Sequence, residues 1–208
     1  MKISKHVHSC LLIEDQGKVV LTDPGNFTAE TNALNLNRIS QLDAILITHH
    51  HLDHLYIPLL KELLGKFPKA TVFSNDAVKE ILDKENIPVI TSPNDFVTLH
   101  PEPHEKVFDK TPPDNAVFTI FGRLLHPGDC FSFKLSTDIL ALPIQATWGS
   151  TTQAVEKALT ILPKVVIPIH DWHMKDELRR GLYDRLEEYF NRFDIAFKKL
   201  ETGEVVEV

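Results

Sequence analysis

Short apolar runs rich in β-branched residues recur along the 208 residues of this chain, and each is bounded by Gly, Pro, Asp or Asn. Runs of this kind between turn-forming residues are typical of β-strands. They cover residues 10–13, 18–22, 44–48, 70–73, 117–121, 139–142 and 165–169. The pattern therefore predicts a fold built around β-sheet.

Segments between several of these runs carry apolar residues at helical spacing. The clearest helix begins at Ser150, because Ser150 and Gln153 form a capping-box pattern, and it ends before Pro163. The other expected elements are helices over residues 59–64, 78–82 and 175–193 and a closing strand over residues 204–208. Strands stand alone in the first quarter and alternate with helices afterwards, which predicts a mixed α/β fold with helices covering the sheet faces.

The bulk composition limits the class of protein. With 43% hydrophobic residues, residues 1–208 are expected to form a single domain with a real core. No stretch approaches the roughly 20 apolar residues of a membrane span, and the N-terminus lacks the apolar core of a signal peptide. Two cysteines, Cys10 and Cys130, are too few for a disulfide framework. We therefore expect a cytoplasmic protein with no membrane contact.

The net charge and the histidine content limit the range of functions that the chain can have. A formal net charge of −7 and scattered lysines argue against binding of nucleic acid through its phosphates. The chain has 11 histidines, and histidine is the commonest metal ligand and the commonest general acid or base. The positions of these histidines therefore decide the functional interpretation.

The strongest motif follows the apolar run at residues 44–47. Buried strands in α/β proteins deliver functional residues at their carboxyl ends. This run leads into His49, His51, Asp53 and His54, with the spacing H-x-H-x-D-H. The first three share a period of two and face one side of an extended chain, and a turn would bring His54 into the same space. A tag would lie at a terminus, so the motif predicts metal binding.

A helical reading of this segment would pair His50 with His54 at the i, i+4 spacing of zinc proteases. That motif needs a Glu directly after the first His, and the chain has His51 there. The helical reading is therefore rejected.

Further candidate ligands lie after other apolar runs. His170 ends the run at residues 165–169, and Asp129 follows the apolar pair at residues 124–125. Gly128 permits close backbone approach there, and the Asp129 carboxylate has two oxygens with which it could bridge two cations. The shared position after apolar runs predicts that these side chains converge on one edge of the fold.

His104 lies in the one long irregular stretch, residues 101–114, which contains four prolines and no convincing periodicity. Loops of this length in compact domains are often functional, although a plain surface excursion fits the sequence equally well. His100, at the end of a strand-like segment, is a rival ligand because a proline-rich loop can present either imidazole.

The ordered set of H-x-H-x-D-H, a His, a Gly-Asp pair and a His at a strand end resembles the metallo-β-lactamase superfamily over nearly the whole chain. Residues 21–25, Leu-Thr-Asp-Pro-Gly, are similar to that family's first motif. The Asp of that motif supports the ligand loop, which is the segment with the H-x-H-x-D-H spacing, residues 49–54 in this chain. Around Asp129 and His170 the chain looks most like the small lactonase-like hydrolases. The resemblance implies a four-layer αββα sandwich with mixed sheets inside and helices on the outer faces.

Carried over position by position, the resemblance implies two divalent metal ions. The ligands would be His49, His51 and His104 for one ion and Asp53, His54 and His170 for the other, with Asp129 between them. The match of residues 102–104 to the family pattern favours His104 over His100. Zinc is the expected metal, with manganese or iron as alternatives. Cys130 stands where the family commonly has Ser or Thr.

Such a dinuclear metal centre implies a metal-dependent hydrolase. Two ions about 3.5–4 Å apart lower the pKa of a shared water and supply a bridging hydroxide, which the catalytic Asp53 would orient. We expect an ester-like or lactone bond of a small metabolite as substrate, and the net positive site would favour an anionic one. The alternatives are a phosphodiesterase or ribonuclease with the same centre, and a metal-binding sensor or scaffold without turnover.

Residues beside the ligands are candidates for substrate binding, namely His126, Trp148, Trp172 and His173. The remaining histidines, His6, His8, His50 and His100, are assigned to structure or solvent. The expected partner is a small-molecule substrate and not a nucleic acid, and the sequence indicates no oligomeric state.

Overall fold

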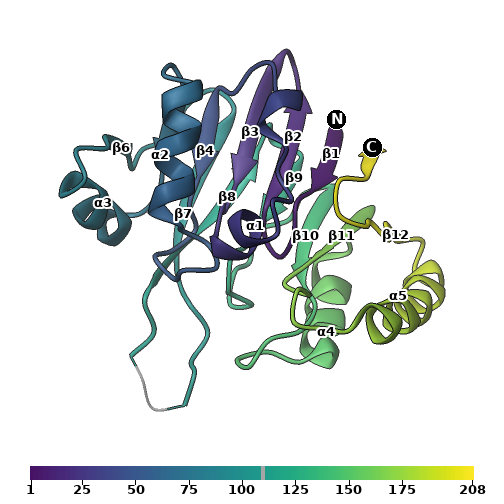
Figure 1. Ribbon diagram of the computed structural model, residues 1–208. Helices are drawn as coiled ribbons and strands as arrows, with labels where there is room; N and C mark the ends of the chain where they lie inside the picture. The colour runs from purple at the N-terminus through teal and green to yellow at the C-terminus, as the bar shows by residue number, and fades with distance from the viewer. Residues whose placement is uncertain (109–110) are drawn as a thin grey trace.

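Two β-sheets pack face to face between helices in the computed structural model, which describes residues 1–108 and 111–208 (Figure 1). The first sheet has the order β13 (Val205–Glu207), β1 (Lys2–Lys5), β2 (Leu11–Asp15), β3 (Lys18–Thr22), β4 (Ala44–Leu46), β5 (Thr71–Phe73) and β6 (Val89–Ile90). The second has the order β12 (Ala196–Phe197), β11 (Val165–Ile169), β10 (Ile139–Pro143), β9 (Leu124–His126), β8 (Asp114–Ile120) and β7 (Val97–Pro103).

Each sheet combines antiparallel and parallel pairs. In the first, β13, β1, β2 and β3 are antiparallel neighbours, and β3 to β6 run parallel. In the second, β7, β8 and β9 are antiparallel, and β9 to β12 run parallel. Parallel strands end at the same edge of a sheet, so the chain segments that leave them are collected on one side of the molecule.

Alternating side chains along the strands separate the core into three apolar clusters. In β4, Ala44 and Leu46 face the second sheet, whereas Ile45 faces helices α2 (Ile57–Lys66) and α3 (Asp76–Asp83). In β10, Leu140 faces the other outer helices, α4 (Thr151–Ile161) and α5 (Asp176–Asn191). Three apolar interfaces separate four layers, so the expected αββα sandwich is confirmed.

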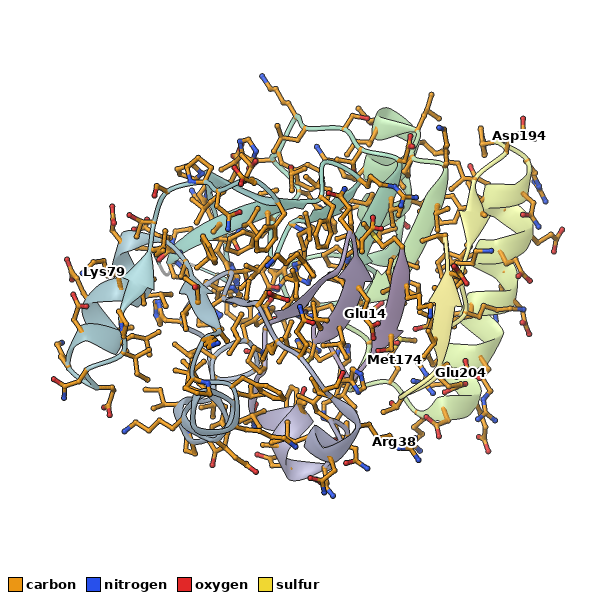
Figure 2. All side chains as sticks on the ribbon, turned by 90° about the horizontal axis from the view of Figure 1, so that it is seen from above. Glu14, Arg38, Lys79, Met174, Asp194 and Glu204 are labelled. Atoms are coloured by element: carbon orange, nitrogen blue, oxygen red, sulfur yellow. The ribbon has the colours of Figure 1, made fainter. Side chains whose placement is uncertain are left out.

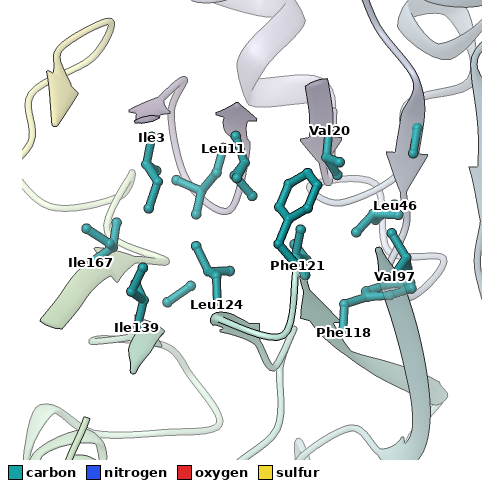
Figure 3. Close-up of a cluster of buried hydrophobic side chains, with 14 of the residues drawn as sticks. Ile3, Leu11, Val20, Leu46, Val97, Phe118, Phe121, Leu124, Ile139 and Ile167 are labelled. Carbon is teal, nitrogen blue, oxygen red and sulfur yellow. The ribbon is translucent and has the colours of Figure 1, made fainter. Parts of the chain in front are cut away.

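The central cluster joins the two sheets (Figure 3). It includes Ile3, Leu11, Val20 and Leu46 from the first sheet and Phe118, Leu124, Ile139 and Ile167 from the second. Each such side chain is fully or almost fully buried, and complete burial of one contributes roughly 1.5–3 kcal/mol. Seen from above in Figure 2, side chains fill the space between the sheets, and helix α5 lies at the periphery. The strand ends are therefore held on a rigid scaffold.

The first quarter is not made of strands alone, so that prediction was wrong. Helix α1 (Asn26–Glu30) and the 3₁₀ helix η1 (Leu36–Arg38) follow β3. Both are too short to carry a helical hydrophobic period, and α1 has no side-chain cap that a sequence pattern would reveal.

The stretch at residues 101–114 is also more regular at its ends than the sequence predicts. Strand β7 continues to Pro103, and β8 begins at Asp114, with Pro101 paired to Ala116. Prolines are tolerated here because β7 is the edge strand of its sheet, where a missing N–H breaks no ladder.

Other predicted elements are confirmed with small shifts at their ends. The capping box of α4 forms as expected between Ser150 and Gln153, and the helix ends at Leu162 in a left-handed conformation before Pro163. The expected last helix forms as α5, and the expected closing strand forms as β13. Within residues 1–108 and 111–208, no helix has the length and apolar character needed to cross a bilayer.

Both cysteines lie in the interior, and burial raises the pKa of the Cys10 and Cys130 thiols. The thiolate is the reactive form, so we predict that neither thiol reacts with a chromogenic disulfide reagent in the folded protein. Both should react within minutes once the chain is unfolded in denaturant. Rapid modification of either residue under native conditions would contradict this packing.

Candidate metal centre

The chemically active side chains gather at the edge where the strands end. His49, His51, Asp53 and His54 follow β4, Asp129 follows β9, and His170 follows β11. His104 comes directly after the edge strand β7, and its backbone N–H bonds Pro113 across the hairpin. The convergence predicted from the apolar runs is therefore present in the fold.

Potential ligand atoms form two adjacent groups, and within each group all of these atoms lie within 4.8 Å of one another. One group is His49, His51, His104 and Asp129, and the other is His8, Asp53, His54 and His170. All seven residues predicted as ligands are thus brought together, with the division between two ions that the resemblance implies. Their binding of metal stays a prediction.

Asp129 lies between the groups. One of its carboxylate oxygens, Oδ2, is 3.2 Å from Nε2 of both His104 and His170, and the other, Oδ1, is 3.1 Å from His54 Nε2. It therefore reaches imidazoles of both groups, as a carboxylate that bridges two cations must.

Within residues 1–108 and 111–208, three buried polar atoms of the centre make no hydrogen bond of normal geometry, namely His54 Nε2, His104 Nε2 and Asp129 Oδ1, although the two ring nitrogens lie 3.1–3.2 Å from the Asp129 oxygens. The opposite ring nitrogens are engaged. Nδ1 of His54 lies 2.7 Å from Asp23 Oδ2, and that of His104 lies 2.5 Å from the Glu105 carbonyl oxygen. Nδ1 of His170 likewise lies 3.0 Å from the Gln145 carbonyl oxygen. An Nδ1–H donated to such an oxygen leaves the Nε2 lone pair pointing inward, which is the arrangement of a metal-binding histidine. The residues present therefore fit divalent cations.

The electrostatics of the centre support this interpretation. Burial, together with the charge of His54, lowers the pKa of His49 well below its usual value, so its ring is neutral and able to coordinate. Burial alone would raise the pKa of Asp129, but His170 and His54 outweigh it and hold that pKa well below its usual range. The same pairing raises the pKa of His54, against the effect of burial, through Asp129 and Asp23. The buried carboxylates thus favour positive charge in the centre.

Asp23 holds the ligand loop in place. Its Oδ1 accepts a hydrogen bond from Thr48 N at 2.8 Å, and its Oδ2 accepts one from Thr48 Oγ1 at 2.9 Å. Oδ2 also contacts His54 Nδ1, and the Asp23 side chain is fully buried. This is the supporting role that the resemblance implies for the Asp of residues 21–25.

Two glycines allow close approach of backbone at the centre. A Cβ on Gly25 would lie 1.8 Å from the carbonyl oxygen of Asp53. Gly128, with φ of +59°, would bring a Cβ to 2.2 Å from Asn115 Oδ1. The loops that carry Asp53 and Asp129 therefore require glycine at these positions.

The four candidate substrate-binding residues have different surroundings. Trp172 and His173 are exposed near His170, and Trp172 packs against Phe27 with ring centroids 5.7 Å apart. Trp148 is half-buried and donates its indole N–H to Asp129 Oδ2 at 2.9 Å. His126 is fully buried, with Nε2 3.0 Å from the Ser9 carbonyl, so its ring is engaged in the interior.

His8 belongs to the centre although the sequence assigned it to structure or solvent. It is 3% exposed, and its Nε2 lies 3.1 Å from Asp53 Oδ2. Burial and the neighbouring His170 lower its pKa to about 4. The only sequence signal is its position just after the first strand, and that strand was not predicted because Lys2 and Lys5 obscure its apolar pattern.

Comparison with known proteins identifies the family. A family model described as a beta-lactamase superfamily domain matches residues 2–170. The chain belongs to the metallo-β-lactamase superfamily. Protein Rv0786c of Mycobacterium tuberculosis is 29% identical to it, over 90% of this chain and 92% of that protein.

Two further proteins are similar along most of their length. A UPF0173 metal-dependent hydrolase of Geobacillus thermodenitrificans is 30% identical, over 82% of this chain and 85% of that protein. The solved structure of Igni18, a metallo hydrolase of Ignicoccus hospitalis, has a TM-score of 0.74 at 22% identity and covers 99% of this chain and 97% of its own. At that identity Igni18 shows the shared fold.

We predict that Gly25→Ala displaces the ligand loop, because its Cβ would overlap the Asp53 backbone. The free energy of unfolding should fall by about 1–3 kcal/mol, and metal affinity should fall with it. Gly181→Ala in α5 is the control, since nothing lies within 4 Å of the added Cβ there, and it should leave metal binding unchanged. Denaturant melts and metal titration of both variants test this, and a fully metal-competent Gly25→Ala protein would contradict the packing.

His104 and His100 offer a second paired test. His104 Nε2 contacts Asp129, whereas His100 lies within β7, paired with Val117, and belongs to neither ligand group. We predict that His104→Ala loses metal during dialysis, as measured by elemental analysis, and that His100→Ala keeps the wild-type content. The opposite result would transfer the ligand role to His100.

Proposed function

We propose that this chain is a metal-dependent hydrolase that cleaves an ester-like or lactone bond in a small metabolite. The observation that supports this most strongly is the set of buried, unpartnered ring nitrogens that converge around Asp129. Membership of a superfamily with a relative named as a metal-dependent hydrolase adds to it. A non-catalytic sensor or scaffold would be expected to lose ligands, so the complete set of candidate ligands favours an enzyme.

The residues of the chain would divide the work. His49, His51, His104 and Asp129 would hold one cation, and Asp53, His54 and His170 the second, with Asp129 shared. Divalent ions at these residues would supply a water of lowered pKa and would polarise a carbonyl oxygen. Asp53 is 28% exposed and is the one carboxylate of the centre that reaches solvent among the described residues. It is therefore the group suited to orient an attacking water.

The surroundings of the centre support a substrate with an apolar part. Trp148 and Phe27 are half-buried, and Trp172 and Leu52 are 40% and 59% exposed. These side chains come from the segments that carry or flank the ligands. Aromatic walls around a few polar groups are typical of small-molecule sites.

A neighbouring cavity supports an anionic group on that substrate. It has a volume of about 600 Å³ and includes His8 and Trp172 in its lining. Its charged lining residues are Lys5, Lys175, Arg179 and Arg180 against Asp171, Asp176 and Glu201. Lys5, Arg179 and Arg180 form ion pairs with these carboxylates. Among the described lining residues, Lys175 is the cation that makes no ion pair, so a negatively charged group would be attracted to it.

Hydrolysis should depend on metal and on Asp53. We predict that the purified protein hydrolyses aryl esters or lactones, that a chelator abolishes the activity, and that added zinc or manganese restores it. Asp53→Asn should lower kcat by at least about 100-fold, since removal of a positioned catalytic group typically costs 10²–10⁴-fold. A panel of esters, lactones and phosphodiesters read by absorbance tests this. Preference for phosphodiesters would replace the ester assignment, and no turnover of any member would remove the proposal.

Lys175 tests the preference for an anionic substrate. It is exposed at the cavity, and one such charge contributes about 0.2–1 kcal/mol. We therefore predict that Lys175→Ala raises KM roughly 1.5- to 5-fold for a carboxylated ester and leaves KM unchanged for its neutral analogue. Steady-state kinetics on the two esters measure this, and equal effects on both would contradict a charge contribution.

A further inference from the structure

His8 contributes an imidazole to the second ligand group that the metal assignment above does not use. Its Nε2 lies 3.1 Å from Asp53 Oδ2, and its ring centroid lies 3.9 Å from that of His170. The ring is 3% exposed, so water does not compete for Asp53 at this contact.

The backbone that carries His8 is strained. Val7 has φ of +72° and His8 has φ of +56°, and a β-branched residue rarely adopts the left-handed region. The turn is closed by hydrogen bonds from His6 N to Cys10 O at 2.7 Å and from Cys10 N to Val7 O at 3.0 Å. His170 N also donates to His8 O at 3.2 Å, which ties the turn to the end of β11. Such strain persists where surrounding contacts enforce it, and it clusters at functional sites.

Three of the predicted ligand histidines share a hydrogen-bond pattern that His8 lacks. His54, His104 and His170 each have Nδ1 against an oxygen, of Asp23, Glu105 and Gln145 respectively. A metal-bound histidine almost always donates its other N–H to such an acceptor. His8 Nδ1 is buried and has no hydrogen-bond partner in the described part of the chain. A proton on Nδ1 would have no acceptor among the described residues, whereas a proton on Nε2 can be donated to the Asp53 carboxylate.

We propose that His8 is a positioning residue that donates its Nε2–H to Asp53 Oδ2 and does not coordinate metal. This bond fixes the one solvent-reaching carboxylate of the centre. The carboxylate is thereby held beside the second ligand group, where the same Oδ2 lies 3.8 Å from His54 Nε2. The catalytic consequence rests on the proposed function, whereas the consequence for metal affinity does not.

Two substitutions of His8 distinguish the effect of its N–H group from the effect of its ring shape. His8→Phe keeps a planar ring without an N–H, and His8→Gln keeps an amide N–H that can reach Asp53. The measurement is a titration with Co²⁺, followed by the visible absorption that reports the ligand set. We expect His8→Phe to weaken the second ion about 10- to 100-fold, the usual cost of losing an outer partner of a ligand. His8→Gln should restore most of that affinity, and fully loaded His8→Phe should keep the wild-type absorption bands.

A double substitution tests the route of the effect. If His8 acts through Asp53, adding His8→Phe to Asp53→Asn should change Co²⁺ affinity by less than about twofold, because the partner is already altered. His6→Gln is the matched control from the same turn. The His6 ring bonds Ser4 and the Ala33 carbonyl and contacts no predicted ligand, so this variant should bind Co²⁺ as the wild type does.

Three results would overturn the proposal. If the Co²⁺ absorption bands are altered in both single variants, His8 is a metal ligand. If folded His8→Phe binds Co²⁺ with wild-type affinity, the role of His8 is purely structural. If the wild-type protein does not bind Co²⁺, the metal centre itself is absent. Should circular dichroism show that His8→Phe does not fold, His8→Asn takes its place, since its shorter amide falls short of Asp53. In an active enzyme, His8→Phe should lower kcat with KM unchanged. An enzyme inactive on every substrate would remove the proposed function and leave the Co²⁺ comparison intact.

Discussion

The charge of one buried carboxylate governs this centre. Asp129 is 2% exposed and is surrounded by imidazoles of His54, His104 and His170 at 3.1–3.2 Å. An ionised carboxylate cannot be buried without compensation, and three neutral rings supply no net charge. In a metal-free chain the compensation must come from protons on His54 and His170, whose pKa values are raised. Two cations would meet the same demand and would also satisfy the unpartnered ring nitrogens.

The fold meets the geometric requirement that this charge imposes. The parallel halves of both sheets end at one edge, and the central apolar cluster fixes the two sheets against each other. Ligands far apart in the sequence, such as His49 and His170, therefore meet without long flexible loops. The buried Asp23 carboxylate then fixes the ligand loop through its contacts with Thr48 N and His54 Nδ1. Gly25 and Gly128 permit the close backbone contacts that this arrangement needs.

Much of this arrangement could be predicted from the sequence, because the signals are local. Apolar runs that end in His or Asp predicted the strands and the candidate site residues at their ends, and the H-x-H-x-D-H spacing predicted four candidate ligands in a single segment. The four-layer architecture came from the family resemblance, since strand order depends on contacts between distant segments. Pro101 and Pro103 hid the end of β7, because proline is acceptable in a strand only when that strand lies at an edge, and edge position is a tertiary property.

His8 escaped prediction for a related reason. Its role depends on a left-handed turn at Val7 and on the distance to Asp53, and neither leaves a local pattern. His126 shows the opposite case, since its place beside Asp129 in the sequence suggested substrate contact, whereas its ring lies in the interior against Ser9. A place beside a candidate ligand in the sequence is thus weak evidence for the direction in which a side chain points.

The most direct test of the account is a crystal structure of the protein grown with Zn²⁺ or Mn²⁺, with anomalous scattering recorded at the absorption edge of the metal. Two anomalous peaks about 3.5–4 Å apart are expected, one on each side of Asp129, with His104 and His170 on different ions. A structure without a peak at Asp129, or with metal bound only elsewhere on the molecule, would contradict it.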